Sequence, residues 1–393
     1  MKKNIVLKTT FKALLAYIGC IVMAFLVMYL INGTVGVLLM TALIIALILS
    51  VMSALAVMPS LKVDMQLDRQ VLFKGEDLTC TLSMTKKILI PAPMVEIHID
   101  CTPQLSKEIN ICRAVVAGSE VNTVKIPVNA KYSGRADVSI REVFVCDYFG
   151  IFRFRLKKNI INDNVKVSVY PNIPDVPVQT NFLKTAVLFS SDDNEEETNE
   201  TALTPTGQPG YDHREYYPGD PIKRINWKMS SKKDVYMVRL DEKLTGGGQV
   251  FFLDVPEAEE NDKTLSVRDR VIEGMLAVLT MLVREGRETV FFMPDRSGWL
   301  RTDIKLPADI YAIQQRLSDF SPCEAEKIVP PEIAGMGKTP ICFTAATAET
   351  AQSAVNIVSE IPDILLICSS DSGLPHITSE LWTVSEGFEL KRI

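Results

Sequence analysis

The chain has 393 residues, of which 47% are apolar and 23% are charged, so it is long enough for two or three domains with separate cores. A net charge of −6 argues against a protein whose main work is to bind the nucleic acid backbone, which needs a net basic footprint. The eight cysteines lie singly, with no CxxC pair and no zinc-type spacing to histidine, which predicts reduced and buried thiols.

The first feature along the chain is a stretch without charged residues, Ala13 to Met58. Its 46 residues are enough for two bilayer spans of about 20 residues each. The turn dipeptide Asn32-Gly33 stands near the middle and predicts the reversal between two transmembrane helices. A cleaved signal peptide is disfavoured, because its apolar region is only about 7 to 15 residues long.

The charges that flank this stretch predict its orientation. Lysines precede and follow the two helices, and the positive-inside rule places such flanks in the cytoplasm. They are Lys2, Lys3, Lys8, Lys12 and Lys62. We therefore expect residues 1–60 to be a membrane anchor that contacts the lipid bilayer through residues 13–58, in a multi-pass protein of the cell membrane with a cytoplasmic C-terminal region.

Residues 61–178 alternate apolar and polar side chains, as in "VEIHID" (95–100) and "VSIREVFV" (138–145). This period of two, punctuated by glycine and proline, predicts an antiparallel β-sandwich of roughly seven strands. An acidic stretch with turn residues follows, which predicts a linker over residues 179–210, although an acidic docking segment for a basic partner is an alternative.

The last part of the chain, residues 246–393, has a different pattern. Apolar runs typical of buried parallel strands alternate with amphipathic segments such as residues 267–286. The runs are "GQVFFLDV" (248–255), "TVFFMP" (289–294), "PICFTA" (340–345) and "ILLICSS" (364–370). The pattern predicts a doubly wound α/β domain.

Between linker and α/β domain, residues 211–245 contain "REYYPGDPIKRINWKMSSKKDVYMVRLDE" (214–242). Pro218-Gly219 fits a type II turn, because glycine adopts the positive φ that its third position requires. Asp220 followed by proline resembles a helix N-cap with proline at the first helical position. We therefore expect a helix from Asp220 to about Ser230.

The expected helix has two unlike faces. Ile222, Ile225 and Met229 would form the core face. The other face would hold Lys223, Arg224, Trp227 and Lys228. Cations around an indole can bind a phosphate, an acidic protein partner or a lipid headgroup. The alternative is that Trp227 packs against a neighbouring domain and that the lysines are solvated.

This stretch resembles the signature of the family named domain of unknown function 58. The matching residues are Arg214, Glu215, Tyr216, Pro218, Gly219, Asp220, Arg224, Ile225, Trp227, Lys228 and Ser230, while Ser231 stands where the family more often has alanine. Upstream, "CDYFGIF" (146–152) and "VYP" (169–171) are similar to further motifs of the family, with Tyr148 in place of the usual proline. The two expected membrane spans also agree with it.

The resemblance implies a C-terminal domain similar to von Willebrand factor type A domains and an association with MoxR-type AAA+ ATPases. It implies no established activity. We therefore expect a membrane-anchored cytoplasmic interaction or scaffold protein that is not an enzyme and needs no cofactor or nucleic acid. The candidate partner-binding residues are Arg214, Tyr216, Pro218, Gly219, Asp220, Lys223, Arg224, Trp227 and Lys228.

The alternative function is a metal-dependent binding module or an enzyme with its site near Asp254. This residue ends the first apolar run, at the edge of the sheet where α/β domains bind ligands. A type A domain that binds Mg²⁺ has the pattern D-x-S-x-S there, because a hard cation prefers carboxylate and hydroxyl oxygens. Here Pro256 and Ala258 replace both serines, so Asp254 is a weak candidate and we expect no metal site.

Overall fold

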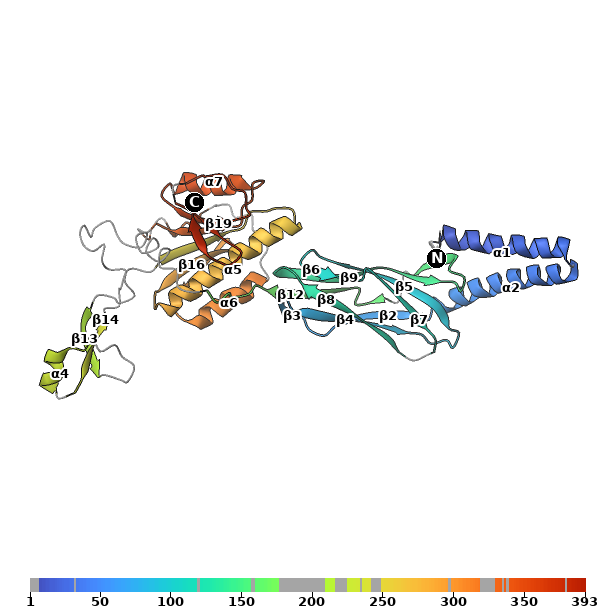
Figure 1. The fold of residues 1–393 in the computed structure, drawn as a ribbon, viewed down its shortest axis with the longest axis horizontal. Coiled ribbons are helices and arrows are strands. Elements are labelled where there is room, and N and C mark those ends of the chain that lie inside the picture. Colours follow the sequence, from blue (N-terminus) through green and yellow to red (C-terminus); the bar gives the residue numbers. More distant parts are fainter. Residues whose placement is uncertain are drawn as a thin grey trace. The chain divides into compact units, whose positions relative to one another are not determined.

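The computed structural model describes residues 7–31, 33–118, 121–156, 160–176, 209–215, 225–233, 235–241, 249–295, 298–318, 329–333, 336, 339–378 and 380–393 (Figure 1). The contacts divide the chain into two compact units. The first is Met1–Asn172 with Gln315–Phe320, and the second is Ile173–Gln314 with Ser321–Ile393. Residues 177–208, which include most of the predicted acidic linker, lie outside the described residues.

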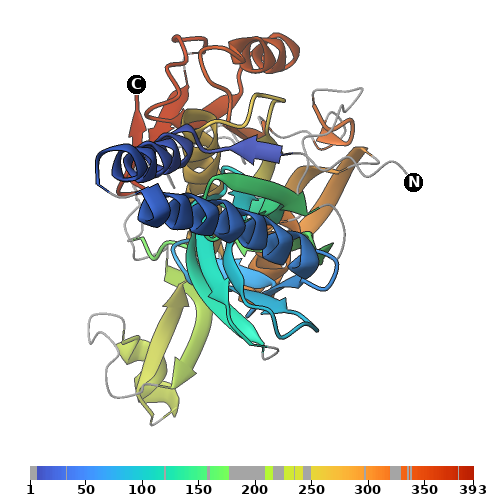
Figure 2. The same cartoon turned by 90° about the vertical axis from the view of Figure 1, so that its right-hand side faces the viewer.

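The first unit begins with two apolar helices, α1 (Phe11–Leu30) and α2 (Gly33–Val57), which lie side by side (Figures 1 and 2). Both are long and apolar enough to cross a membrane, and only 11% of the most apolar part of each is buried. A core helix of a soluble protein would be mostly buried. The predicted pair of apolar N-terminal helices is therefore confirmed.

The two helices pack closely against each other. Gly36 of α2 lies against Met28 of α1, where a Cβ atom would have no room. The Tyr17 hydroxyl donates a hydrogen bond to the carbonyl oxygen of Leu43 at 2.6 Å. Small residues at such a crossing allow the two backbones to approach, which is the usual way that helices pack in lipid.

Two sheets follow and share one core. The first contains β1 (Leu7–Thr9), β10 (Phe152–Leu156), β9 (Gly134–Cys146), β12 (Asn164–Tyr170) and β3 (Val71–Phe73) in that order, with β5 (Ala92–Cys101) on β9 and β7 (Ile111–Val116) on β5. The second contains, in order, β11 (Ile160–Ile161), β2 (Lys62–Leu67), β4 (Asp77–Thr85), β8 (Asn122–Ala130) and β6 (Leu105–Lys107). Inward-facing residues of both sheets, such as Leu82 and Val145, belong to one hydrophobic cluster. The predicted β-sandwich is confirmed, with more strands than expected.

The last two turns of α2 belong to the sandwich as well as to the hairpin. Ala54 and Val57 are fully buried in the sandwich core, and Val51, Leu55 and Met58 pack around them. The strand β1 precedes α1 and pairs antiparallel with β10, and the amide of Thr10 bonds the carbonyl oxygen of Ile151 at 2.9 Å. Both ends of the helical hairpin are therefore attached to the sandwich, which the sequence did not indicate.

The second unit contains a seven-stranded sheet with five parallel strands. In order, its strands are β17 (Gly298–Ile304), β16 (Thr289–Asp295), β15 (Gln249–Asp254), β18 (Ile341–Thr344), β19 (Leu365–Ser369), β20 (Leu381–Val384) and β21 (Leu390–Arg392). The edge strands β17 and β21 are antiparallel to their neighbours. The order reverses direction between β15 and β18, so the two strands define the switch point where α/β sheets bind ligands.

Helices α5 (Asp262–Arg284), α6 (Pro307–Ser318) and α7 (Ala351–Glu360) connect strands of this sheet along the chain. A capping box formed by Asn261 and Thr264 begins α5 five residues before the expected start at residue 267. In its middle, Gly274 approaches β20 so closely that a Cβ atom would lie 2.9 Å from a methyl group of Val384. The helix packs directly on the sheet at this point.

Candidate functional site

The signature stretch forms a small module of its own. Strand β13 (Pro209–Glu215) pairs antiparallel with β14 (Met237–Asp241), and the short helix α4 (Trp227–Lys233) lies between them in the chain. Arg214 is in β13, opposite Val238. The remaining candidates before the helix lie outside the described residues: Tyr216, Pro218, Gly219, Asp220, Lys223 and Arg224.

The start of the helix differs from the prediction. Ile225 and Asn226 are not helical, and the amide of Asn226 bonds the carbonyl oxygen of Met237 at 2.8 Å. The Asn226 side chain accepts the amide hydrogen of Met229 at 3.2 Å, so Asn226 takes the role of N-cap. The expected continuous helix from Asp220 to Ser230 is therefore wrong at Ile225 and Asn226, because Ile225 forms a β-bridge and the amide of Asn226 is bonded to β14. Residues 220–224 lie outside the described residues.

Ser230 stabilises the module from inside. Its buried hydroxyl donates to the carbonyl oxygen of Asn226 and accepts from the amide of Met237, both at 2.8 Å. The bonds join the first turn of α4 to the start of β14. Met237 is buried as well, and Ile225 and Met229 are half-buried, so these residues form the inner side of the module.

The outer side of the module is aromatic and basic. Trp227 is 61% exposed and Tyr236 is 59% exposed, and their rings meet edge to face with centroids 6.0 Å apart. Lys228, Lys232 and Lys233 are exposed on the same short helix. We call Trp227, Tyr236 and these three lysines the aromatic-basic surface. Trp227 and Lys228 were expected on it, whereas Tyr236 was not.

At the switch point of the second unit, Asp254 ends β15. Its carboxylate accepts hydrogen bonds from the hydroxyl of Thr344 at 2.7 Å and from that of Ser353 at 3.0 and 3.1 Å. Burial raises the pKa of Asp254, and these two hydrogen bonds oppose the rise. The carboxylate thus joins the ends of β15 and β18 to helix α7.

The same edge of the sheet has a small pocket of about 40 Å³, lined in part by Pro256, Glu260, Arg268 and Thr347. Space of this size holds a few water molecules at most. In the part of the chain that the structure describes, no three His, Cys, Asp or Glu side chains are grouped so that they could hold a metal ion. Thr344 and Ser353 do supply hydroxyl oxygens, but both hydroxyls donate to Asp254.

The turn that resembles a family motif, Asp147 to Gly150, has a role that sequence reasoning missed. The buried Asp147 carboxylate accepts the amide hydrogens of Phe149 at 3.1 Å and Phe152 at 2.7 Å, and the hydroxyl hydrogen of Ser50 at 3.1 Å. Ser50 in turn accepts the amide hydrogen of Tyr148 at 2.7 Å. The motif therefore attaches helix α2 to the sandwich, and a serine near the end of an apolar helix was the signal.

A second buried carboxylate, Glu96, lies among three basic side chains. His98 is 2.9 Å away, and Arg113 and Arg153 are each 3.1 Å away. Burial alone would raise the pKa of Glu96, but the hydrogen bonds from His98 and Arg113 and the charge of Arg153 outweigh it and lower the pKa. The cluster is an ion network on the outer face of the first sheet, in which Glu96 is buried beneath its basic partners.

No family model matches the chain, and no curated protein matches it. Solved structures match parts of it. A non-cellulosomal cohesin from Archaeoglobus fulgidus is 10% identical over 28% of this chain and 91% of its own, with a TM-score of 0.22. A type II cohesin domain from Acetivibrio cellulolyticus is 9% identical over 28% of this chain and 95% of its own, with a TM-score of 0.23.

The fragment of alpha-2-macroglobulin from Escherichia coli that runs from domain MG7 to the C-terminus is 17% identical over 29% of this chain, with a TM-score of 0.23. This chain spans only 17% of that fragment. Likenesses at these scores decide neither the fold nor the function. The architecture described above therefore depends on strand pairing and core contacts alone.

Proposed function

We propose that this chain is a membrane-anchored scaffold protein of the domain-of-unknown-function-58 family, whose soluble region lies in the cytoplasm and binds a MoxR-type AAA+ ATPase. In this proposal the second unit is a von Willebrand factor type A-like domain. Its parallel sheet, with helices between the strands and Asp254 at the switch point, supports that assignment. The motif resemblance supplies the family and the class of partner.

The observation that carries the proposal is the aromatic-basic surface. Trp and Tyr are the residues that most often dominate the binding energy of protein interfaces. Here both rings are more than half exposed beside three exposed lysines. An acidic protein surface is the partner that fits it, because carboxylates complement the lysines while its apolar atoms cover the rings.

A pull-down of the full-length protein in mild detergent with a purified MoxR-type ATPase, with and without ATP, tests the proposal. We expect Lys228→Glu with Lys232→Glu to weaken binding about tenfold or more, since complementary charges become like charges. The matched control is Lys125→Glu with Lys166→Glu, which reverses two exposed lysines of the sandwich. Equal loss in both variants, or no ATPase binding by the wild type, would refute the partner assignment.

The orientation has its own test. A reporter fused after Ile393 should behave as cytoplasmic, and a tag inserted at Asn32-Gly33 should be reached from outside the cell. Both expectations follow from the lysines that flank the hairpin. A C-terminal reporter on the outside would remove the cytoplasmic ATPase from consideration.

The alternative, a metal-dependent module at Asp254, is tested by thermal unfolding with and without Mg²⁺. A ligand at about 100 times its dissociation constant stabilises a protein by about 2.7 kcal/mol. We expect no such stabilisation, because Asp254 is engaged by Thr344 and Ser353, and Pro256 and Ala258 offer no hydroxyl. A rise in melting temperature that Asp254→Asn abolishes would favour the metal-dependent module.

A further inference from the structure

Exposed apolar side chains gather at the end of the sandwich where the helices enter. Leu89 is 81% exposed and Ile90 is 41% exposed, both in the loop between β4 and β5. Tyr148 and Phe149, in the turn after β9, are 52% and 40% exposed. We call these four residues the apolar rim. Soluble surfaces do carry scattered apolar residues, but two adjacent loops that each present a pair of them indicate a contact surface.

Hydrogen bonds fix the rim to the base of the hairpin. The Tyr148 hydroxyl donates to the carbonyl oxygen of Pro91 at 3.2 Å, and the Tyr148 amide bonds Ser50 of α2. The ammonium group of the buried Lys86 donates to the carbonyl oxygens of Ile90 and of Ala117, the latter at 3.0 Å. The rim is therefore held beside the point where α2 leaves the sandwich.

The length of the exposed part of α2 places this end of the sandwich at the bilayer. Helix α2 is largely exposed from Gly33 to Leu49 and packs on the sandwich from Ser50 onward. Those 17 residues span about 26 Å at 1.5 Å per residue, slightly less than the hydrocarbon core of about 30 Å. No further turn of α2 separates the membrane-spanning part of the helix from the sandwich. A hairpin that crosses the membrane therefore brings the apolar rim into the headgroup layer.

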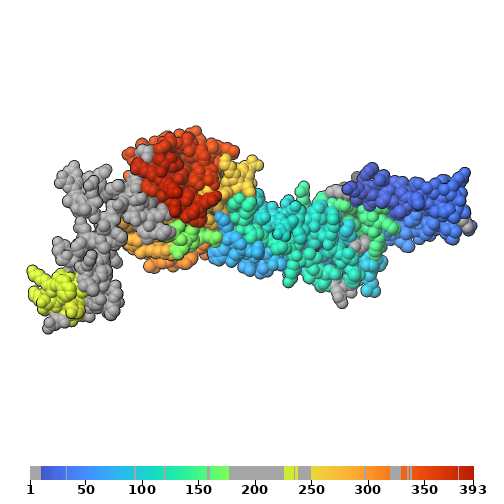
Figure 3. Space-filling model, viewed as in Figure 1, coloured from blue at the N-terminus to red at the C-terminus, as the bar shows by residue number. Residues whose placement is uncertain are grey.

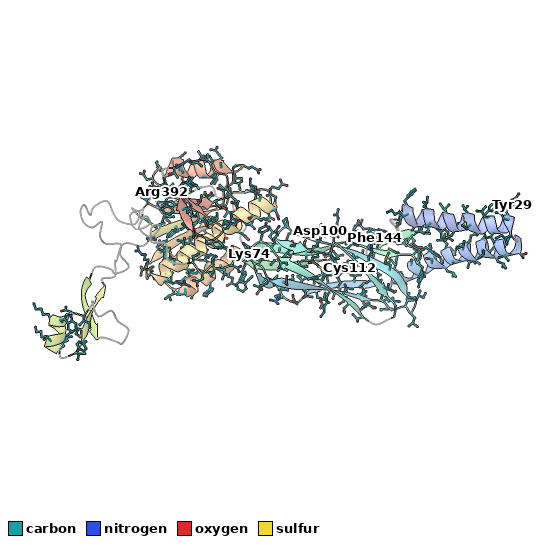
Figure 4. All side chains as sticks on the ribbon, in the orientation of Figure 1. Tyr29, Lys74, Asp100, Cys112, Phe144 and Arg392 are labelled. Atoms are coloured by element: carbon teal, nitrogen blue, oxygen red, sulfur yellow. The ribbon has the colours of Figure 1, made fainter. Side chains whose placement is uncertain are left out.

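The charges beside the rim fit the surface of an anionic bilayer. Lys12 and Lys87 are exposed there, whereas the nearby carboxylates Asp147 and Glu96 are buried and hydrogen-bonded. Exposed lysines next to apolar and aromatic side chains are typical of segments that lie in the membrane interface. Figure 3 shows the hairpin in blue projecting from the sandwich, and Figure 4 labels Tyr29 at its tip and Lys74 at the opposite end of the sandwich.

We infer that the apolar rim inserts into the headgroup layer of the membrane that the hairpin crosses, so that the sandwich binds anionic phospholipid directly and keeps a fixed orientation on the bilayer. The inference rests on the proposed membrane anchoring. It adds a lipid-binding surface on the soluble domain, which the hairpin alone does not require.

Photo-crosslinking of the full-length protein in vesicles of phosphatidylcholine and phosphatidylglycerol tests the inference. A benzophenone amino acid replaces Leu89 in one variant and Phe73 in the matched control. Phe73 is also an exposed apolar residue, 44% exposed. It pairs with Tyr170 of β12, next to Gly134 at the start of β9, whereas the apolar rim lies beyond Cys146 at the end of β9. The 13 residues of β9 separate these two ends by about 40 Å. Mass spectrometry then measures the phospholipid adduct at each position.

We expect at least about tenfold more phospholipid adduct at position 89 than at position 73, as for a side chain held in the interface. Adding Lys87→Glu should reduce the adduct in the mixed vesicles and not in phosphatidylcholine alone. Vesicle flotation separates the two proposals. Protein that fails to float contradicts the membrane anchor itself, whereas protein that floats without an adduct at position 89, or with crosslinks to a second protein there, overturns the lipid-binding rim.

Discussion

The two stretches that resemble family motifs differ in how their charged side chains are placed. In the turn from Asp147 to Gly150, the Asp147 carboxylate accepts hydrogen bonds from the amides of Phe149 and Phe152 and from the hydroxyl of Ser50. Gly150 adopts a φ of +66°, which favours glycine. In the module around α4, the hydroxyl of Ser230 is hydrogen-bonded inside the module, but Trp227 and the lysines of the aromatic-basic surface are exposed. The charged group of the first stretch therefore joins α2 to the sandwich, whereas the charged groups of the second stretch are exposed to solvent.

Charged side chains show the same contrast. Arg113 and Arg153 direct their guanidinium groups to the buried Glu96. For the exposed Lys228 and Lys232, no ion pair occurs among the described residues. Cations that are paired internally contribute to folding, whereas exposed cations are available to a partner. Four substitutions should separate the side chains that stabilise the fold from those that bind a partner.

The largest effect is expected for Asp147→Ala. It leaves the Ser50 hydroxyl and the amides of Phe149 and Phe152 without their acceptor in a buried place, which costs about 3 kcal/mol or more of unfolding free energy. Denaturation in detergent measures the change. The control is Asp163→Ala, at an exposed aspartate of the same sandwich, which should change stability by less than about 0.5 kcal/mol.

Ser230→Ala should have an intermediate and local effect. It removes the acceptor for the buried Met237 amide, at a cost of about 1 to 2 kcal/mol. Hydrogen exchange should then become faster at the amides of Met237 and Ser230, while the amides of β9 stay protected. Uniformly faster exchange across the whole chain would mean that the module is not an independent unit.

A smaller effect is expected from the titration of Glu96. Because its folded pKa is lowered, this group contributes stability that is present above the unfolded pKa of about 4.3 and is lost as the pH falls through the folded pKa. Melting temperatures between pH 6 and pH 3 measure the loss. The variant Glu96→Gln should be less stable at pH 6, and its melting temperature should depend less on pH between 6 and 3. If the melting temperature of the variant falls with pH as steeply as that of the wild type, a group other than Glu96 causes the acid dependence.

The smallest effect on stability is expected for Trp227→Ala. An indole that is 61% exposed contributes little to the core, so the melting temperature should change by the equivalent of less than about 1 kcal/mol. Binding to the proposed ATPase should nevertheless weaken tenfold or more, as for a central aromatic residue of an interface. A large loss of stability would instead show that Trp227 is a folding residue, as the alternative interpretation of the sequence holds.

Patterns of apolar residues predicted the parts of the fold that depend on continuous or alternating burial. The uncharged stretch predicted α1 and α2, and the apolar runs coincide with β15, β16, β18 and β19. The packing of Ala54 and Val57 was not predictable, because an apolar side chain is equally compatible with lipid and with a protein core. The three residues of β1 are too few to show an alternation of apolar and polar side chains, so the sequence did not distinguish this strand from an irregular segment before α1.

Local signals failed where tertiary contacts compete with them. A continuous helix from Asp220 to Ser230 was expected, but the helix that contains Ser230 begins at Trp227, because Asn226 is bonded to β14 and caps this helix. Asp220 and Pro221 lie outside the described residues. Trp227 and Lys228 were selected because they share one face of the expected helix. Tyr236 lies beyond that helix, directly before β14, and its ring contacts Trp227. Asp254 was placed at the correct edge, while its hydroxyl partner Ser353 lies 99 residues away.

The pairing of β1 with β10 also sets the order of events during biosynthesis. Residues 7–9 leave the ribosome roughly 140 residues before their partners at 152–154, which at 5 to 20 residues per second is about 7 to 28 s. The hairpin can enter the membrane during this interval, while the sandwich is still incomplete. Pairing of β10 with β1 then attaches the N-terminal end of the hairpin to the sandwich. In the proposed membrane anchor, a chain whose residues 7–9 lie on the other side of the bilayer from the sandwich cannot form this pairing.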